Sequence, residues 1–197
     1  MTLTLLIFFG LVIPLAIAIK WTRRIPRPDY KVIKKERNIQ IREYAPMILA
    51  EVQVLGDRKQ AINQGFRVLA KYIFGGNSLN KKMAMTAPVT QQKFKDSWKV
   101  RFVMEKQYTL ETLARPLSLQ VNVHPVDAKN FVVIRFNGLA TDKNILKHTK
   151  KLQAYISGNH LISTDDPILA FYNPPWTLPF FRRNEVMVEI KTNKRSK

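Results

Sequence analysis

The chain has 197 residues, of which 46% are hydrophobic, and it contains no cysteine. Disulfides, thiolate metal sites and a cysteine nucleophile are therefore excluded. The formal net charge of +19 implies attraction to anionic lipid, nucleic acid or acidic ligands. Since the sequence has no zinc-finger spacing and no aromatic-rich RNA-binding signature, an anionic membrane surface is favoured and nucleic acid is not expected as a partner.

An uncharged apolar run from Thr2 to Ile19 opens the chain and is near the lower length limit for crossing a bilayer. Trp21 follows in the position of an interfacial aromatic, and basic residues come after it. We expect residues 1–20 to form a transmembrane anchor and residues 21–29 a basic linker. The positive-inside rule then makes the chain a single-pass membrane protein whose domain lies in the cytoplasm.

A cleaved signal peptide is the alternative interpretation of this segment. Ala16 and Ala18 form an Ala-x-Ala pattern, after which cleavage would export the domain. A retained anchor accounts better for Trp21 and for the basic flank, which consists of Lys20, Arg23, Arg24 and Arg27. The chain also ends on a basic tail, predicted as flexible over residues 192–197.

Residues 30–191 have the pattern of one domain. Alternating apolar and polar residues predict strands over residues 31–44 and 48–55. A helix follows, with Asp57 as its N-cap and Gly75 at its end. Its apolar face carries Ile62, Phe66, Leu69 and Ile73. Two further strands are predicted over residues 83–89 and 98–104.

The second half of the domain repeats this order. Strands are predicted over residues 119–126 and 131–139, then a helix from Thr141 to Gly158, then strands over 168–172 and 186–190. The domain is thus two strand-strand-helix-strand-strand units. We predict an α+β fold: a curved antiparallel sheet or open barrel with two packed helices. A groove between a helix and such a sheet is the natural ligand site.

The residues that usually carry chemistry form no catalytic pattern. His124, His148 and His160 are not paired at metal-ligand spacing, and no serine lies in a nucleophile elbow. Asp165 and Asp166 precede a proline in an evident turn. We therefore expect no enzyme activity and no catalytic residues, and a metal ligand is not identified.

Two segments are better candidates for binding. On a strand over residues 83–89, Met83 and Met85 share one face and form an adaptable apolar wall. Residues 173–181 form an apolar loop with three prolines, in which Trp176 and two phenylalanines must pack on a ligand, a membrane surface or the domain itself. Arg182 and Arg183 follow and are able to meet carboxylates or lipid phosphates.

Several segments, taken together and in order from Tyr30 to Ile190, resemble the SOUL/haem-binding protein family. Met85-Thr86-Ala87-Pro88-Val89 and Arg182-Arg183-Asn184-Glu185-Val186 are specific in combination. The other matching pieces are Tyr30–Ile33, Ile41-Arg42-Glu43-Tyr44, Phe66–Asn77, Val100–Met104, Arg135-Phe136-Asn137-Gly138 and Tyr172–Trp176.

The resemblance implies a duplicated β-β-α-β-β domain that binds haem or a related porphyrin non-covalently in an apolar groove. The groove would lie between the first helix and the late proline-rich loop, with Arg67 or Lys71 meeting the propionates. A histidine ligand near Arg42-Glu43-Tyr44 is absent here. The expected site consists of Ile62, Phe66, Arg67, Leu69, Lys71, Met85, Trp176, Leu178 and Phe181.

The expected function is carriage, buffering or sensing of haem by a membrane-tethered protein. The alternative is a module without haem on the same fold, which senses another small ligand or contacts a membrane surface or a partner. In that case the basic ends and the loop from Trp176 to Phe181 would face lipid or the partner. The sequence does not identify a protein partner.

Overall fold

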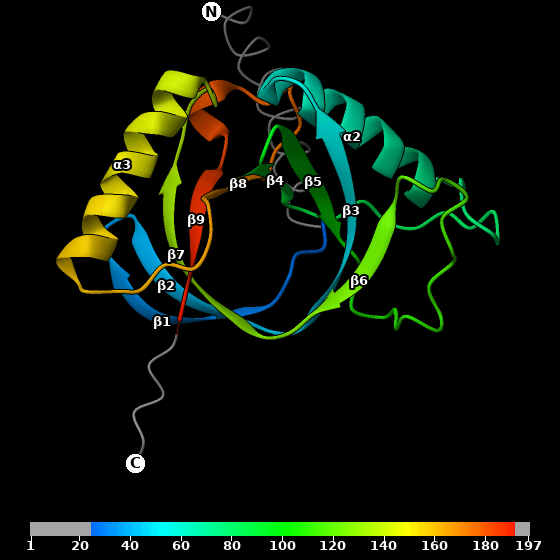
Figure 1. Ribbon diagram of the computed structural model, residues 1–197, viewed down its shortest axis with the longest axis horizontal. Helices are drawn as coiled ribbons and strands as arrows, with labels where there is room; N and C mark the ends of the chain where they lie inside the picture. Colours follow the sequence, from blue (N-terminus) through cyan, green and yellow to red (C-terminus); the bar gives the residue numbers. More distant parts are fainter. Residues whose placement is uncertain (1–24, 192–197) are drawn as a thin grey trace, which may run out of the picture.

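The computed structural model describes residues 25–191, which form one curled antiparallel sheet of nine strands with two helices on its outer face (Figure 1). The elements are β1 (Tyr30–Glu36), β2 (Ile39–Tyr44), β3 (Met47–Leu55), α2 (Arg58–Ile73), β4 (Val89–Phe94), β5 (Ser97–Val103), β6 (Asn122–Val126), β7 (Lys129–Phe136), α3 (Asp142–Gly158), β8 (Ile168–Phe171), the short 3₁₀ helix η1 (Pro179–Phe181) and β9 (Asn184–Ile190).

The predicted anchor, the first four residues of the predicted linker and the predicted tail, residues 1–24 and 192–197 together, lie outside the described residues. Within residues 25–191, neither helix is long and apolar enough to cross a membrane.

The sheet order confirms the duplicated pattern. The strands follow one another as β1-β2-β7-β9-β8-β4-β5-β3-β6. The first unit is β2, β3, α2, β4 and β5, and the second is β6, β7, α3, β8 and β9. When each strand of one unit is exchanged for its counterpart, the order from β2 to β6 reads the same in reverse. The α+β fold is therefore two interleaved halves, with β1 added at one edge.

Two strand predictions need correction. The strand predicted over residues 31–44 is a hairpin of β1 and β2, because the chain turns at Arg37, whose φ is 51°. The strand predicted over residues 83–89 is wrong: it is irregular, with a cis bond before Pro88, and β4 begins only at Val89. Proline has no N–H for a central ladder, and Thr86 Oγ1 instead donates to the Val103 carbonyl at 2.6 Å.

Both predicted helix caps are confirmed. The Asp57 side chain accepts hydrogen bonds from the N–H groups of Lys59 and Gln60, and Thr141 accepts one from Asn144. Each bond satisfies an N–H group that the helix itself leaves unpaired. The two helices begin at the same end of the molecule, where Arg58 of α2 forms an ion pair with Asp142 of α3 at 2.8 Å.

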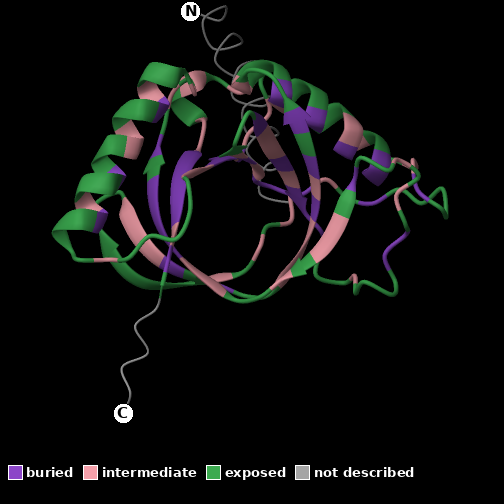
Figure 2. Cartoon of the chain, viewed as in Figure 1, coloured by how far each residue is buried: buried purple, intermediate pink, exposed green. Residues whose placement is uncertain are grey.

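The core has two layers outside the sheet and one inside. Figure 2 shows that buried residues run along the central strands, including β3, β5, β7 and β9. The first cluster joins α2 to β3 and β5 around Val52, Leu69 and Phe102. The second joins α3 to β7 and β9 around Leu152 and Val186. The third lies on the inner face and is built from Tyr44, Ala87, Phe131, Val133, Ala170, Tyr172 and Met187.

Gly65 sets the approach of α2 to the sheet, because a Cβ there would lie 2.7 Å from Val100 Cγ2 and 3.1 Å from Val52 Cγ2. We predict that Gly65→Ala destabilises the protein by about 1–3 kcal/mol through this overlap, despite the better helix propensity of alanine. Urea unfolding measures the change. The control is Gly158→Ala at the end of α3, where a Cβ meets nothing within 4 Å. Equal midpoints for the two variants would contradict this account.

Candidate functional site

The structure brings part of the predicted apolar wall together against the first cluster, beneath and beside α2. Ile62 and Met85 pack, partly buried, against the first cluster, and the exposed Phe66 places its ring 5.4 Å from that of Phe102 in an edge contact. Leu69 needs correction, because it is fully buried inside the cluster and offers no surface to a ligand. The helix face that was predicted as one wall is thus divided between core and surface.

Two predicted cations lie beside the exposed part of this wall. Arg67 and Lys71 are one turn apart on α2, and both are exposed. Ile62, Phe66 and Ala70 follow one another at the same four-residue spacing on the adjoining row of the helix. The outer surface of α2 therefore carries an apolar row next to a basic row.

The structure does not pack the late loop into the core. Trp176, Leu178 and Phe181 are exposed, and none of them belongs to the three hydrophobic clusters of residues 25–191. The Gly138 N–H donates to the Pro179 carbonyl at 2.9 Å, which holds the loop beside the turn between β7 and α3. Ala140 belongs to this turn between β7 and α3. Its carbonyl accepts a hydrogen bond at 3.1 Å from Nη2 of Arg58, which lies in the first turn of α2. The loop therefore lies at the start of α2, and whether it completes a groove there stays a prediction.

A cavity of about 580 Å³ opens elsewhere, among the linker residues 26–29, the turn between β2 and β3, and the ends of β5 and β6. Apolar side chains such as those of Met47, Val103 and Met104 form part of its wall. Its charged residues are Arg27, Asp29, Glu105, Lys106 and Asp127, so the acidic groups outnumber the basic ones. None of the nine residues predicted from the sequence lines this cavity.

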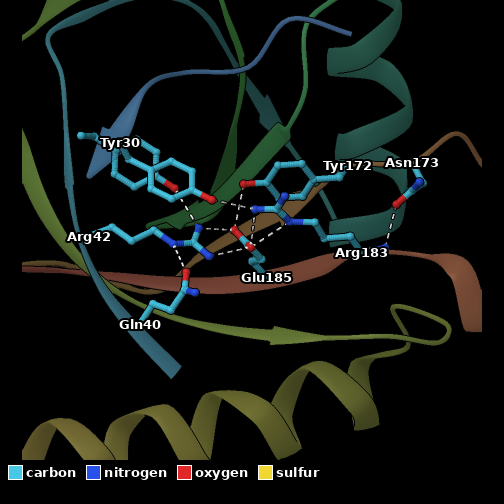
Figure 3. Close-up of polar contacts among 8 residues, drawn as sticks. Tyr30, Gln40, Arg42, Tyr172, Asn173, Arg183 and Glu185 are labelled. Carbon is cyan, nitrogen blue, oxygen red and sulfur yellow. Dashed lines mark hydrogen bonds and ion pairs between the residues drawn. The ribbon is translucent and has the colours of Figure 1, made fainter. Parts of the chain in front are cut away.

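A buried ionic cluster lies on the inner face of the sheet (Figure 3). Arg42 of β2 donates two hydrogen bonds to the Glu185 carboxylate of β9, at 2.9 and 3.0 Å. Arg183 forms a second ion pair with the same carboxylate at 2.8 Å, and the Tyr172 hydroxyl donates to it at 2.8 Å. The Glu185 side chain is completely buried. Two guanidinium groups therefore share one carboxylate, and the cluster carries a net positive charge.

Aromatic rings enclose the two arginines. The Arg42 guanidinium lies 4.4 Å from the centre of the Tyr30 ring, and that of Arg183 lies 3.9 Å from the Tyr172 ring. Such contacts compensate cations for lost hydration. Burial opposes ionisation of Glu185, but the hydrogen bonds and charge of Arg42 outweigh it, so the pKa of Glu185 is lowered. Burial raises the pKa of Tyr172 well above its usual range, and this hydroxyl remains a neutral donor.

The cluster joins four of the sequence segments quoted above, which the sequence did not connect. Arg42 and Tyr44 come from Ile41–Tyr44, Arg183 and Glu185 come from Arg182–Val186, and Tyr30 and Tyr172 come from the two segments that they begin. Arg183 meets a carboxylate, as the sequence allowed, whereas Arg182 donates to the Thr177 and Pro175 carbonyls of its own loop. The sequence did contain one signal for this cluster. Residues two apart on a strand share a face, so Arg42 could be expected beside Tyr44, and Arg183 beside Glu185.

The three histidines lie apart from the α2 surface. His124 is on β6, His148 stacks on Phe136 at 4.1 Å on α3, and His160 follows the end of α3. Within residues 25–191, no three His, Asp or Glu side chains come together as a metal site would require.

Comparisons with known proteins agree on one family. The family model of the SOUL heme-binding protein matches residues 25–189. "Heme-binding protein 1" of Xenopus laevis is 26% identical over 141 residues, which cover 68% of this chain and 73% of that protein.

Solved structures share the fold at low sequence identity. The EcmrR C-terminal domain superposes with a TM-score of 0.61 at 11% identity, over 83% of this chain and 98% of that domain. A hydrolase from Listeria innocua superposes with a TM-score of 0.54 at 12% identity, over 81% of this chain and 94% of that one. At such identities the likeness concerns the fold alone.

The buried cluster yields a stability prediction. Replacing Glu185 by Gln leaves two buried guanidinium groups without a countercharge, so we expect a loss of about 3–5 kcal/mol in the free energy of unfolding at pH 7. Urea unfolding of both proteins measures it. The matched control is Glu189→Gln on the same strand, whose partner Lys129 is partly exposed, with an expected loss below about 1 kcal/mol.

The same comparison has a defined pH dependence. Because the pKa of Glu185 is lowered on folding, its contribution is fully present above its usual pKa of 4.5 and is lost as the pH falls through the lower folded value. The stability difference between the native chain and Glu185→Gln should therefore be constant from pH 7 to pH 5 and should shrink toward pH 3. A difference that grows in acid would contradict the assignment.

Proposed function

The chain belongs to the SOUL heme-binding protein family, and from this membership we propose that it binds haem or a related tetrapyrrole as a membrane-tethered carrier, buffer or sensor. The observation that indicates where the ligand would bind is that an apolar row adjoins a basic row on the outer surface of α2. The family and the Xenopus relative are named for haem binding and not for a reaction.

The chemistry of a tetrapyrrole fits this surface. Its flat faces are apolar, and its propionates are anionic. Phe66 offers an exposed ring, supported from below by Phe102, while Ile62 and Met85 add partly buried apolar surface to the same cluster. Arg67 and Lys71 are suited to the propionates, because charge-assisted hydrogen bonds to carboxylates are the stronger ones. Bound haem would supply the iron chemistry; these residues hold and orient it.

Electrostatics argues against the cavity as the tetrapyrrole site. Three carboxylates border it, and two of them, Glu105 and Asp127, have no ion pair within residues 25–191. An anionic ligand would meet repulsion there, whereas the α2 surface offers two cations and no carboxylate on the same rows. The proposed site on α2 does not depend on Trp176, Leu178 and Phe181, the second wall that the sequence predicts, because all three are exposed and lie outside the first cluster.

Haemin titration of the full-length chain, followed by the Soret band, tests the proposal. We expect saturable binding, and at least about tenfold weaker binding after the double change Arg67→Glu and Lys71→Glu, since each charge-assisted contact is worth about 1.5–3 kcal/mol. The matched control is Lys147→Glu with Lys151→Glu, an equally spaced and exposed pair on α3. No saturable Soret change in the native chain refutes tetrapyrrole binding, and equal weakening by both pairs refutes the α2 site.

We further propose that residues 1–20 anchor the chain in a membrane with the domain on the cytoplasmic side. The apolar run supports a retained anchor, and Val12→Asp would place a charge at its middle at a cost of about 3 kcal/mol. In cells we expect the native chain to keep its full mass and to stay in membranes after an alkaline carbonate wash, and the Val12→Asp variant to be released. A shortened chain outside the membrane would instead indicate signal cleavage and export.

A further inference from the structure

The apolar loop, residues 173–181, exposes large hydrophobic side chains close together in the sequence. The exposed fractions are 77% for Trp176, 52% for Leu178, 60% for Phe180 and 48% for Phe181. A soluble surface rarely concentrates such groups unless they meet a partner or a membrane. The buried ionic cluster and the hydrophobic clusters leave these four side chains without a role.

Hydrogen bonds hold the loop in the conformation that exposes these side chains. Arg182 Nε donates to the Thr177 carbonyl at 2.7 Å, and its Nη2 donates to the Pro175 carbonyl. At the base of the loop, the Tyr172 N–H donates to the Arg183 carbonyl at 3.2 Å, and the Arg183 N–H donates to the Asn173 side chain at 2.7 Å. Since three prolines also limit the backbone, collapse of the loop onto the domain would break several of these bonds.

The base of the loop adjoins the point where the chain enters the domain. Ile25 packs against the inner-face cluster that contains Tyr172, and the Arg27 guanidinium lies 5.6 Å from the centre of the Tyr172 ring. Tyr30 accepts a hydrogen bond from Arg183 at 3.4 Å. From the last residue of the apolar run, Ile19, six residue steps lead to Ile25, and they span at most about 20 Å. A chain anchored by that run would hold the base of the loop near the bilayer.

The charges around this entry point favour an anionic bilayer. Lys20, Arg23 and Arg24 lie within those six steps, and a basic residue close to an anionic membrane contributes about 1 kcal/mol. Tryptophan is also enriched at the level of the lipid headgroups, because its ring is amphipathic. The basic residues at the entry to the domain thus match the anionic lipid headgroups, and the side chains of the apolar loop match the apolar region next to them.

We infer that the apolar loop is a second membrane contact, in which Trp176, Leu178 and Phe180 insert at the headgroup level of an anionic bilayer. This inference rests on the membrane anchor of the proposed function and is independent of haem binding. It orients the domain with the common start of α2 and α3 toward the membrane, because the loop is bonded to the turn that precedes α3.

The absence of cysteine allows a direct test. Leu178→Cys carries a single environment-sensitive fluorophore in the full-length chain, which is reconstituted into vesicles of phosphatidylcholine with phosphatidylserine. The matched control is Leu119→Cys, a fully exposed leucine in the connection from β5 to β6. That connection contacts the segment after the far end of α2 through the hydrogen bond from Ser78 N–H to the Arg115 carbonyl, and α2 is about 24 Å long.

We expect the label at position 178 to shift to the blue and to become several times less accessible to aqueous acrylamide, while the label at position 119 stays accessible. Vesicles of phosphatidylcholine alone should reduce the protection at 178. Flotation of the chain with the vesicles, measured in parallel, reports the anchor. Equal accessibility of the two labels in chains that float overturns the loop contact and leaves the anchor standing. Chains that do not float overturn both. Protection at 178 that appears only with haemin, or only with a protein from the cell extract, also overturns the lipid contact.

Discussion

The ion pair between Arg42 and Glu185 is the interaction on which the inner face of this domain depends. It links β2 to β9 across β7, which lies between them in the sheet, through direct hydrogen bonds between two buried side chains. A buried carboxylate is costly unless its hydrogen bonds are filled, and here two arginines and a tyrosine fill them. The curl of the sheet brings these groups together. Flattening the sheet would separate them and leave buried charges unpaired, which is costly.

The same cluster positions the two surface features of functional interest. Through Arg183 and Tyr172 it fixes the base of the apolar loop, and through Tyr30 it fixes the segment that enters the domain. Loop and entry are therefore held to one rigid centre even though some 150 residues separate them in the chain. A loop that must present apolar groups to a membrane or a ligand gains from such support, because little ordering remains to be done on binding.

The cavity beside the linker and the outer surface of α2 differ in their charge. The cavity beside the linker has the volume of a ligand site, but three of its five charged lining residues are acidic. The α2 surface combines the exposed Phe66 with the exposed Arg67 and Lys71. For an anionic, flat and apolar ligand the second environment is the better match. Family membership suggests the ligand class, and the distribution of charge is the reason for proposing the α2 surface as the site.

The sequence by itself determined the local structure. Asp57 and Thr141 cap the helices through bonds to neighbours two or three residues away, and alternation placed most of the strands, because such signals involve only nearby residues. It also determined the family, through motifs at both ends of the domain. Only the tertiary structure decided that the Arg42 motif meets Glu185, that Leu69 is core while Phe66 is surface, and that residues 83–88 leave the sheet. Each of these depends on which segments the interleaved strand order makes neighbours, and periodicity along one segment carries no information about its neighbour.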